Sequence, residues 1–280
     1  MWIGNEATEM HEIDFRAGRL PGRAILSVGG PEAGHFLHNL LTSDIDHLGP
    51  GQAAYAALLT PQGKILFDMI VVAQDGGYLI DCGASQRADL MKRLAMYKLR
   101  AKVEIAARDD LAVGVSPVEV PGSYRDPRSA DIGWRIIGAP EGEADGYDAA
   151  RIRGGLADSA ADLGSGEFFP HEANLDQLAG VNFRKGCYVG QEVVSRMEHR
   201  GTARSRILPV LLDGVAPPKG TDIRSGDKQV GTLLSSSGSN ALALIRLDRL
   251  AEATAPLLAD GVSLKVLKPA WATYDVPGAA

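Results

Sequence analysis

The alternation of apolar and polar positions between residues 23 and 106 predicts a mixed α/β unit. Short apolar runs of strand length, bounded by turn residues, lie at 24–28, 54–59, 65–73, 78–82 and 103–106. A helix is expected from Pro31, because apolar residues follow it at helical spacing: Ala33, Phe36, Leu37, Leu40 and Leu41. A second helix is expected up to Lys98, with Ser85 as its N-terminal cap. The predicted order is strand, helix, three strands, helix and strand.

Beyond residue 110 the pattern becomes irregular and then turns to β structure. We expect strands at 111–115 and 134–137, a short helix at 147–153, and a long loop at 154–169, a length that is often functional in compact proteins. From residue 204, turn-separated apolar runs at 207–212, 229–235, 241–245 and 262–267 predict a small β-barrel. Three domains are therefore expected, at 20–110, 111–202 and 203–280, after an extension of unassigned role at 1–19.

Composition narrows the classes of protein that fit this pattern. A formal charge of −6 over 280 residues argues against stable binding of nucleic acid. No apolar run approaches the roughly 20 residues of a membrane span, and residues 1–16 are not signal-like, so neither a membrane partner nor export is expected. Two cysteines, Cys82 and Cys187, indicate a reducing compartment, taken to be the cytoplasm. No metal-ligand spacing is present, and nothing in the pattern requires more than a monomer.

One segment is dense in unusual residue choices: Phe183-Arg184-Lys185-Gly186-Cys187-Tyr188-Val189-Gly190-Gln191-Glu192. Glycines on both sides of Cys187 free the backbone for sharp turns. Residues 191–199 favour a helix, whose positive N-terminal end would follow Cys187 closely. That end, together with Arg184 and Lys185, would favour the thiolate form. We therefore predict a reactive Cys187 with Lys185 as its electrostatic activator.

Other interpretations of this segment stay open. Cys187 could equally be a small buried residue in a tight turn, as we expect for Cys82, because free cysteines are among the most buried residue types. Gly186 and Gly190 are expected to act as backbone hinges. Gln191 and Glu192 are expected to anchor the loop by hydrogen bonds.

Cations are in local excess between residues 184 and 206. The acidic residues in this stretch are Glu192 and Glu198, and the basic ones are Arg184, Lys185, Arg196, Arg200, Arg204 and Arg206. This excess suggests an anion site, suited to folate carboxylates or to a phosphate backbone. The alternative is a solvated charged face, which we favour for Arg206 more than for Arg200.

The motif Lys185-Gly186-Cys187-Tyr188-x-Gly190-Gln191-Glu192 resembles the signature of the YgfZ family. These proteins are relatives of the glycine-cleavage aminomethyltransferase and include mitochondrial iron–sulfur assembly factors. The resemblance extends to Tyr147, Arg151, 172–176, 180–181, 199–201 and Arg204. It implies an α+β, aminomethyltransferase-like fold with two mixed α/β, ferredoxin-like domains that bind folate and a small C-terminal β-barrel. The cofactor it implies is tetrahydrofolate or another reduced folate.

The resemblance also implies a function and a set of folate contacts. The implied role is assembly or repair of iron–sulfur enzymes, including tRNA-modifying ones, with Cys187 engaging a partner's cluster or a reactive intermediate. The candidate folate contacts are Asp68, Tyr147, Arg151, Asn174 and Arg200. The aminomethyltransferases carry an aspartate pair where this chain has Phe67-Asp68, so the alternative of a folate-dependent aminomethyltransferase is disfavoured. An RNA-binding module is the weakest alternative because the net charge is negative.

Overall fold

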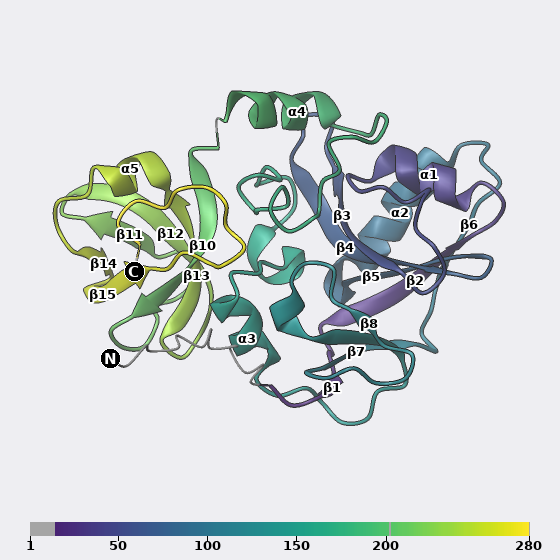
Figure 1. Cartoon of the computed structure of the whole chain (residues 1–280), viewed down its shortest axis with the longest axis horizontal. Helices are drawn as coiled ribbons and strands as arrows, with labels where there is room; N and C mark the ends of the chain where they lie inside the picture. Colours follow the sequence, from purple (N-terminus) through teal and green to yellow (C-terminus); the bar gives the residue numbers. More distant parts are fainter. Residues whose placement is uncertain (1–14, 202, 280) are drawn as a thin grey trace, which may run out of the picture.

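The computed structural model describes residues 15–201 and 203–279 (Figure 1). Its first unit is a five-stranded antiparallel sheet in the order β3-β4-β5-β2-β6. The strands of this sheet are β2 (Arg23–Gly29), β3 (Ala53–Leu59), β4 (Ile65–Gln74), β5 (Gly77–Gly83) and β6 (Glu104–Ala107). All five had been expected from the apolar runs, to within one residue at each end.

Both faces of this sheet are buried, which explains why β3 is a continuous apolar run. Ala56 and Leu58 face helices α1 (Ala33–Leu40) and α2 (Arg87–Lys98), whereas Tyr55 and Ala57 face the centre of the molecule. The expected Ser85 cap is not observed, because a 3₁₀ turn, η1 (Ala84–Gln86), precedes α2. The N-cap is Gln86, whose side chain makes no capping hydrogen bond.

A second, four-stranded antiparallel sheet has the order β1-β7-β9-β8. Its strands are β1 (Gly18–Arg19), β7 (Ala112–Ser116), β8 (Tyr124–Arg125) and β9 (Trp134–Gly138). A 3₁₀ turn, η2 (Ala130–Ile132), precedes β9, and helix α3 (Tyr147–Arg153) follows it with the bounds expected from sequence. Ile25 and Leu79 of the first sheet pack against Val113 of the second, so the two sheets share a contact.

The C-terminal part is a closed six-stranded barrel in the order β10-β13-β12-β11-β14-β15. Its elements are β10 (Ser205–Leu212), β11 (Asp222–Ser225), β12 (Lys228–Ser237), β13 (Asn240–Arg246), helix α5 (Leu247–Ala251), β14 (Leu257–Ala259) and β15 (Val262–Val266). The four longer strands had been expected. The sequence pattern did not identify β11 and β14, which have four and three residues and carry little periodicity.

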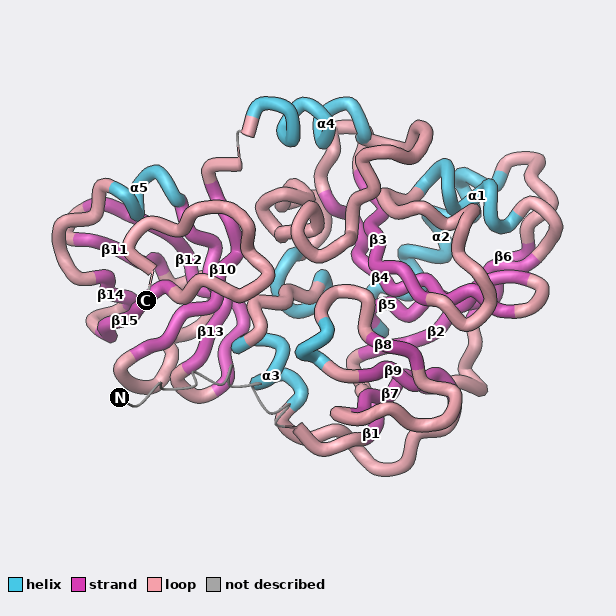
Figure 2. The backbone as a smooth tube through the Cα atoms, viewed as in Figure 1, coloured by secondary structure: helices cyan, strands magenta, loops and turns pink. Residues whose placement is uncertain are grey.

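The segment between α3 and the barrel lies at the centre of the molecule, where Figure 2 shows long stretches of loop. It contains the π-helical turn η3 (Ser159–Leu163) and ends in helix α4 (Gln191–Arg200). Its apolar side chains form one core with residues of both sheets and of the barrel: Leu156, Leu163, Phe168, Leu175, Leu178, Val181 and Tyr188. The expected open loop at 154–169 is therefore partly a buried connector. The domain limits at 110/111 and 202/203 stay predictions.

Within the described residues, no helix has both the length and the apolar character required to cross a bilayer.

Candidate functional site

The loop that carries Cys187 is fastened to the end of helix α1 by Lys185. The Lys185 Nζ atom donates hydrogen bonds to the carbonyl oxygens of His38, Leu41 and Ser43, the last two at 2.6 and 2.9 Å. A helix leaves its last carbonyls unpaired, and their partial negative charge attracts a cation. Burial lowers the pKa of Lys185 to about 8, although nearby Asp44 and Asp46 oppose that shift.

The other end of the loop is fastened to the β3–β4 turn by Gly190. Gly190 has a φ of +81°, and a Cβ atom there would lie 2.6 Å from the carbonyl oxygen of Thr60 and 3.0 Å from the Cα atom of Gly63. Only glycine tolerates both constraints without movement of the backbone. Gly186, by contrast, has open space at its Cβ position and a φ outside the left-handed region, so the structure shows no steric need for glycine there.

Between these two attachments Cys187 is exposed to solvent. The exposure contradicts the alternative in which Cys187 is a buried packing residue. Cys82 fits that description: it is 1% exposed, and burial raises the pKa of its thiol to about 12. In the described part of the chain no hydrogen bond joins Lys185 to Cys187, so Lys185 acts here as an anchor. Its activator role stays a prediction without a structural contact.

The remaining motif residues differ in their placement. Tyr188 is buried, and the Lys185 ammonium lies 5.2 Å from the centroid of its ring. Gln191 and Glu192 begin α4, and Glu192 forms an exposed ion pair with Arg196 along that helix at 3.3 Å. Among the described residues, neither side chain makes a hydrogen bond to the loop. Their role as anchors of the loop therefore stays a prediction without a structural contact.

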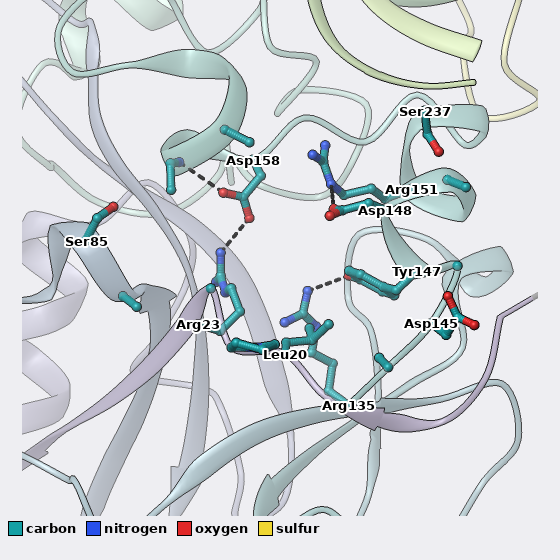
Figure 3. A pocket seen from close by; sticks show the side chains of 18 residues that line it. Leu20, Arg23, Ser85, Arg135, Asp145, Tyr147, Asp148, Arg151, Asp158 and Ser237 are labelled. Atoms are coloured by element: carbon teal, nitrogen blue, oxygen red, sulfur yellow. Dashed lines mark hydrogen bonds and ion pairs between the residues drawn. The ribbon is translucent and has the colours of Figure 1, made fainter. Parts of the chain in front are cut away.

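A cavity of about 690 Å³ lies between the start of β2, η1, α3, η3 and the end of β12. Figure 3 shows the side chains that line it, and the polar ones are Arg23, Ser85, Arg135, Asp145, Tyr147, Asp148, Arg151, Asp158 and Ser237. Of the predicted folate contacts, Tyr147 and Arg151 are in this lining. Asp68, Asn174 and Arg200 are not. Cys187 is also absent from the lining of this cavity.

The wall of the cavity is built on a network of buried charges. Arg23 lies 2.6 Å from Asp81 and 2.7 Å from Asp158, and Arg135 lies 2.6 Å from Asp81. The Tyr147 hydroxyl oxygen accepts hydrogen bonds from the Arg128 and Arg135 guanidinium groups at 2.9 and 2.8 Å. Such buried charges are tolerated because each has an opposite partner. The network therefore holds two sheets and α3 in fixed relative positions around the cavity.

Asp158 connects this network to the cavity. Burial by itself would raise its pKa, but the neighbouring Arg23 and Arg151 guanidinium groups outweigh that effect and lower the pKa of Asp158 to about 2. Asp158 also accepts a hydrogen bond from the Ala160 backbone at 3.0 Å and so begins the η3 turn. The carboxylate is thus held ionised at the cavity wall.

Asp68 is separated from the cavity by η3. It is 2% exposed and accepts hydrogen bonds from the Tyr55 hydroxyl at 2.9 Å and from the Ser159 hydroxyl at 2.5 Å. Burial, followed by the proximity of Asp158, raises the pKa of Asp68. Asp68 does not line the cavity, and its carboxylate is bonded to Ser159, so its contact with folate stays a prediction without structural support.

Asn174 and Arg200 do not line the cavity, so their contact with folate stays a prediction without structural support. Asn174 is 1% exposed; its amide donates to the Ile207 carbonyl at 2.7 Å and its oxygen accepts from the Tyr274 hydroxyl at 2.8 Å. It joins the central segment to the barrel. Arg200 is exposed at the end of α4.

The prediction that Arg206 belongs to a solvated face is wrong. Arg206 is 7% exposed and pairs with Asp176 at 2.6 Å, because the central segment covers that side of β10. Ligand atoms of His171, Asp176 and Glu198 lie within 4.8 Å of one another. These contacts are an ion pair between Arg206 and Asp176 and a hydrogen-bonding contact between His171 and Glu198 at 3.0 Å, and we assign no metal to them.

Sequence reasoning missed Arg23, Arg135 and Asp158 as cavity residues. The three are far apart in sequence and follow no known motif. One signal was available for Arg135, which interrupts the apolar strand at 134–138, and for Asp81, which interrupts the strand at 77–83. A charged residue inside an apolar strand usually has a buried partner.

The architecture places the chain in a known class. It superimposes with a TM-score of 0.73 on the crystal structure of glycine cleavage system aminomethyltransferase T from Bartonella henselae, covering 95% of this chain and 88% of that one. The sequence identity is 14%, so this likeness concerns the fold alone. Residues 204–274 match the family described as CAF17, C-terminal beta-barrel domain. The class is thus the aminomethyltransferase-like fold with a C-terminal barrel, as predicted.

Sequence relatives define the family within this class. The chain is 33% identical over 274 residues to "Iron-sulfur cluster assembly factor IBA57, mitochondrial" of Mus musculus, and 33% identical over 271 residues to its Homo sapiens counterpart. Each alignment covers 81% of this chain and 76% of the relative. A homologue in Pyricularia oryzae is 32% identical over 285 residues, covering 85% and 73%. The chain belongs to the IBA57 family of iron–sulfur cluster assembly factors.

These relatives confirm the expected link to iron–sulfur cluster assembly and correct the expected location. The relatives are named as mitochondrial, which contradicts the predicted cytoplasmic location. The error has a simple origin: two unpaired cysteines indicate a reducing environment and do not identify the compartment that provides it. The closer resemblance to YgfZ stays a prediction.

Proposed function

We propose that the protein assists iron–sulfur cluster assembly by offering the Cys187 thiolate as a ligand to a cluster that a partner protein holds. The observation that carries this proposal is the exposure of Cys187 on a loop attached at both ends to the folded body. A ligand held in a fixed position loses little conformational freedom when it binds. The names of the relatives support the assignment to cluster assembly.

The partner must supply the other ligands. Clusters are held by several cysteine thiolates, and the second cysteine of this chain, Cys82, is buried in the first sheet. On ligation the Cys187 thiol gives up its proton and forms one Fe–S bond, while the remaining Fe–S bonds stay with the partner. The cluster would therefore lie at an interface between the two proteins. The clients we expect from the YgfZ resemblance include tRNA-modifying enzymes, and we propose that the free protein is a monomer.

A reduced folate is the ligand we propose for the cavity. Its volume of about 690 Å³ lies within the usual range for small-molecule sites. Arg151 pairs there with Asp148, whose side chain is 78% exposed, and with the buried Asp162. A folate carboxylate can replace Asp148 beside Arg151 without leaving a buried charge unpaired, because Asp148 then returns to water. Tyr147 and Arg151 are therefore the folate contacts we retain.

The structure argues against an aminomethyltransferase. Asp68 is the remaining member of the aspartate pair that those enzymes carry, and its carboxylate is bonded to Tyr55 and Ser159 instead of facing the cavity. It is therefore not placed to accept a proton from a ligand in the cavity.

The first prediction tests Cys187 directly. In cells that lack this protein, the Cys187→Ser variant is expected to fail to restore the activity of an iron–sulfur enzyme, because a serine hydroxyl is a poor ligand for cluster iron. The same purified variant should bind tetrahydrofolate like the wild type in calorimetry, since Cys187 does not line the cavity.

Cys82→Ala is the matched control, because it removes the other thiol and should restore the client enzyme. Full restoration by Cys187→Ser would contradict the thiolate proposal. Absence of tetrahydrofolate binding by the wild type would contradict the cavity assignment alone.

A further inference from the structure

Helix α2 has one side in the core and the opposite side in water. Leu90 and Leu94 are fully buried beneath the first sheet. Lys92 and Met96 are four residues apart on the other side of the helix, and Leu99 directly follows its last residue, Lys98. Met96 is 61% exposed and Leu99 is 88% exposed. Two large apolar side chains are therefore exposed at the C-terminal end of α2.

The backbone at Leu99 is unusual for an exposed leucine. Leu99 ends the helix with a φ of +46°, a conformation that side chains other than glycine rarely adopt. A glycine at this C-terminal position would remove the strain. Residues held in such conformations cluster at functional sites. The chain instead keeps an apolar side chain at the outermost point of the helix end.

Cations are frequent in the sequence on both sides of Leu99. Residues 92–102 contain no acidic side chain and five basic ones: Lys92, Arg93, Lys98, Arg100 and Lys102. In the described part of the chain none of the five forms an ion pair. The protein as a whole has a charge of −6, so this concentration of positive charge is local.

We propose that the outer side of α2 and the turn to Lys102 attach the protein to the surface of an anionic lipid bilayer. Leu99 and Met96 would enter the boundary between headgroups and acyl chains, while the five cations would contact lipid phosphates. Exposed apolar side chains in a cation-rich segment favour a lipid surface over nucleic acid, for which the leucine would have no partner. This attachment is peripheral, and it differs from the expectation of no membrane partner, which rested on the lack of a spanning segment.

The experiment is co-sedimentation of the full chain with vesicles. Vesicles of phosphatidylcholine with about 30% phosphatidylglycerol are compared with pure phosphatidylcholine, at low salt and at increasing salt. The protein is expected to bind the anionic vesicles alone and to dissociate as salt rises. Each cation near an anionic surface contributes roughly fivefold to partitioning, so Lys98→Glu with Arg100→Glu should weaken binding by a factor of at least roughly 20.

Leu99→Gly separates binding from folding. It removes the apolar tip but relieves the positive φ, so thermal stability should be unchanged or higher while vesicle binding falls severalfold. The matched charge control is Lys265→Glu with Lys268→Glu on the exposed side of the barrel, which should bind like the wild type.

Three results would overturn the proposal. They are an absence of binding to anionic vesicles at low salt, equal binding by the α2 variants and the wild type, and binding to soluble polyglutamate as tight as to vesicles with no effect of Leu99→Gly. The last result would assign this surface to an acidic protein.

Discussion

Gly186 and Gly190 are glycines four positions apart, but the surroundings of Gly190 require a glycine and those of Gly186 do not. Gly190 combines a left-handed φ with backbone atoms of the β3–β4 turn close to its missing Cβ. Gly186 meets neither constraint. The difference concerns single atoms around each residue, and no sequence motif distinguishes the two.

We therefore expect Gly190→Ala to lower the free energy of unfolding by roughly 1–3 kcal/mol, because the methyl group must displace backbone atoms and the left-handed φ adds strain. Gly186→Ala should change it by less than about 0.5 kcal/mol. Urea denaturation of both variants measures the two values. Similar values for the two would show that the close approach at Gly190 is not a constraint in solution.

Helix α1 is completed by a residue from a distant part of the chain. Its C-terminal carbonyls are bonded by the Lys185 ammonium, which takes the place of a local cap. Because the same lysine precedes Cys187 by two residues, the end of this helix determines where the thiol is held.

Replacing Lys185 with methionine keeps the bulk of the side chain and removes the charge and its donors. The free energy of unfolding is expected to fall by about 1–3 kcal/mol, since carbonyl groups lose their partner in a half-buried position. Hydrogen exchange of the amides at 184–190 should accelerate more than exchange in the barrel. Lys228→Met, at a lysine whose side chain is 70% exposed, serves as the control and should alter neither quantity. Unchanged loop exchange in Lys185→Met would exclude the anchoring role.

The molecule as a whole is held together by one central core and by the buried charges around the cavity. Arg23 of the first sheet pairs with Asp158 of the central segment, and Arg135 of the second sheet pairs with Asp81 of the first. Each pair joins parts of the chain more than fifty residues apart. Their geometry therefore reports on the assembled tertiary structure.

Asp158 should make this assembly sensitive to acid. Its pKa is about 2 in the folded protein against an ordinary 3.8, so its stabilising effect is complete above pH ~4 and is lost as the pH falls through 2. The wild type should lose on the order of 2 kcal/mol more than Asp158→Asn between pH 4 and pH 2. The neighbouring Asp68 has a raised pKa and the opposite sign, and because Asp158 contributes to that rise, the comparison with Asp158→Asn reports on both carboxylates together. Parallel stability curves for the two proteins, measured by denaturant titration at each pH, would rule out this linkage.

Local pattern identified most elements but not their environment. Helix α3 was expected at 147–153 and lies at Tyr147–Arg153, because the stretch is bounded by glycines and has helical spacing. Arg206 was expected to face solvent, because Arg204 and Arg206 alternate with Ser205. This alternation does not show whether a distant segment covers the face on which Arg206 lies. Asp68 was expected to contact folate, and the pattern could not show that its carboxylate is bonded to Ser159. Ser159 lies 91 residues away in the sequence.

The sequence by itself determined the longer strands and most of the helices, the barrel, the scaffold class and the unusual cysteine loop, because periodicity, turn residues and motif identity are local properties. Only the tertiary structure decided that Cys187 is exposed, that Lys185 holds the end of α1, and that the cavity is lined by Arg23, Arg135 and Asp158. These facts depend on contacts between residues far apart in the chain. Burial and charge pairing exist only after such contacts have formed.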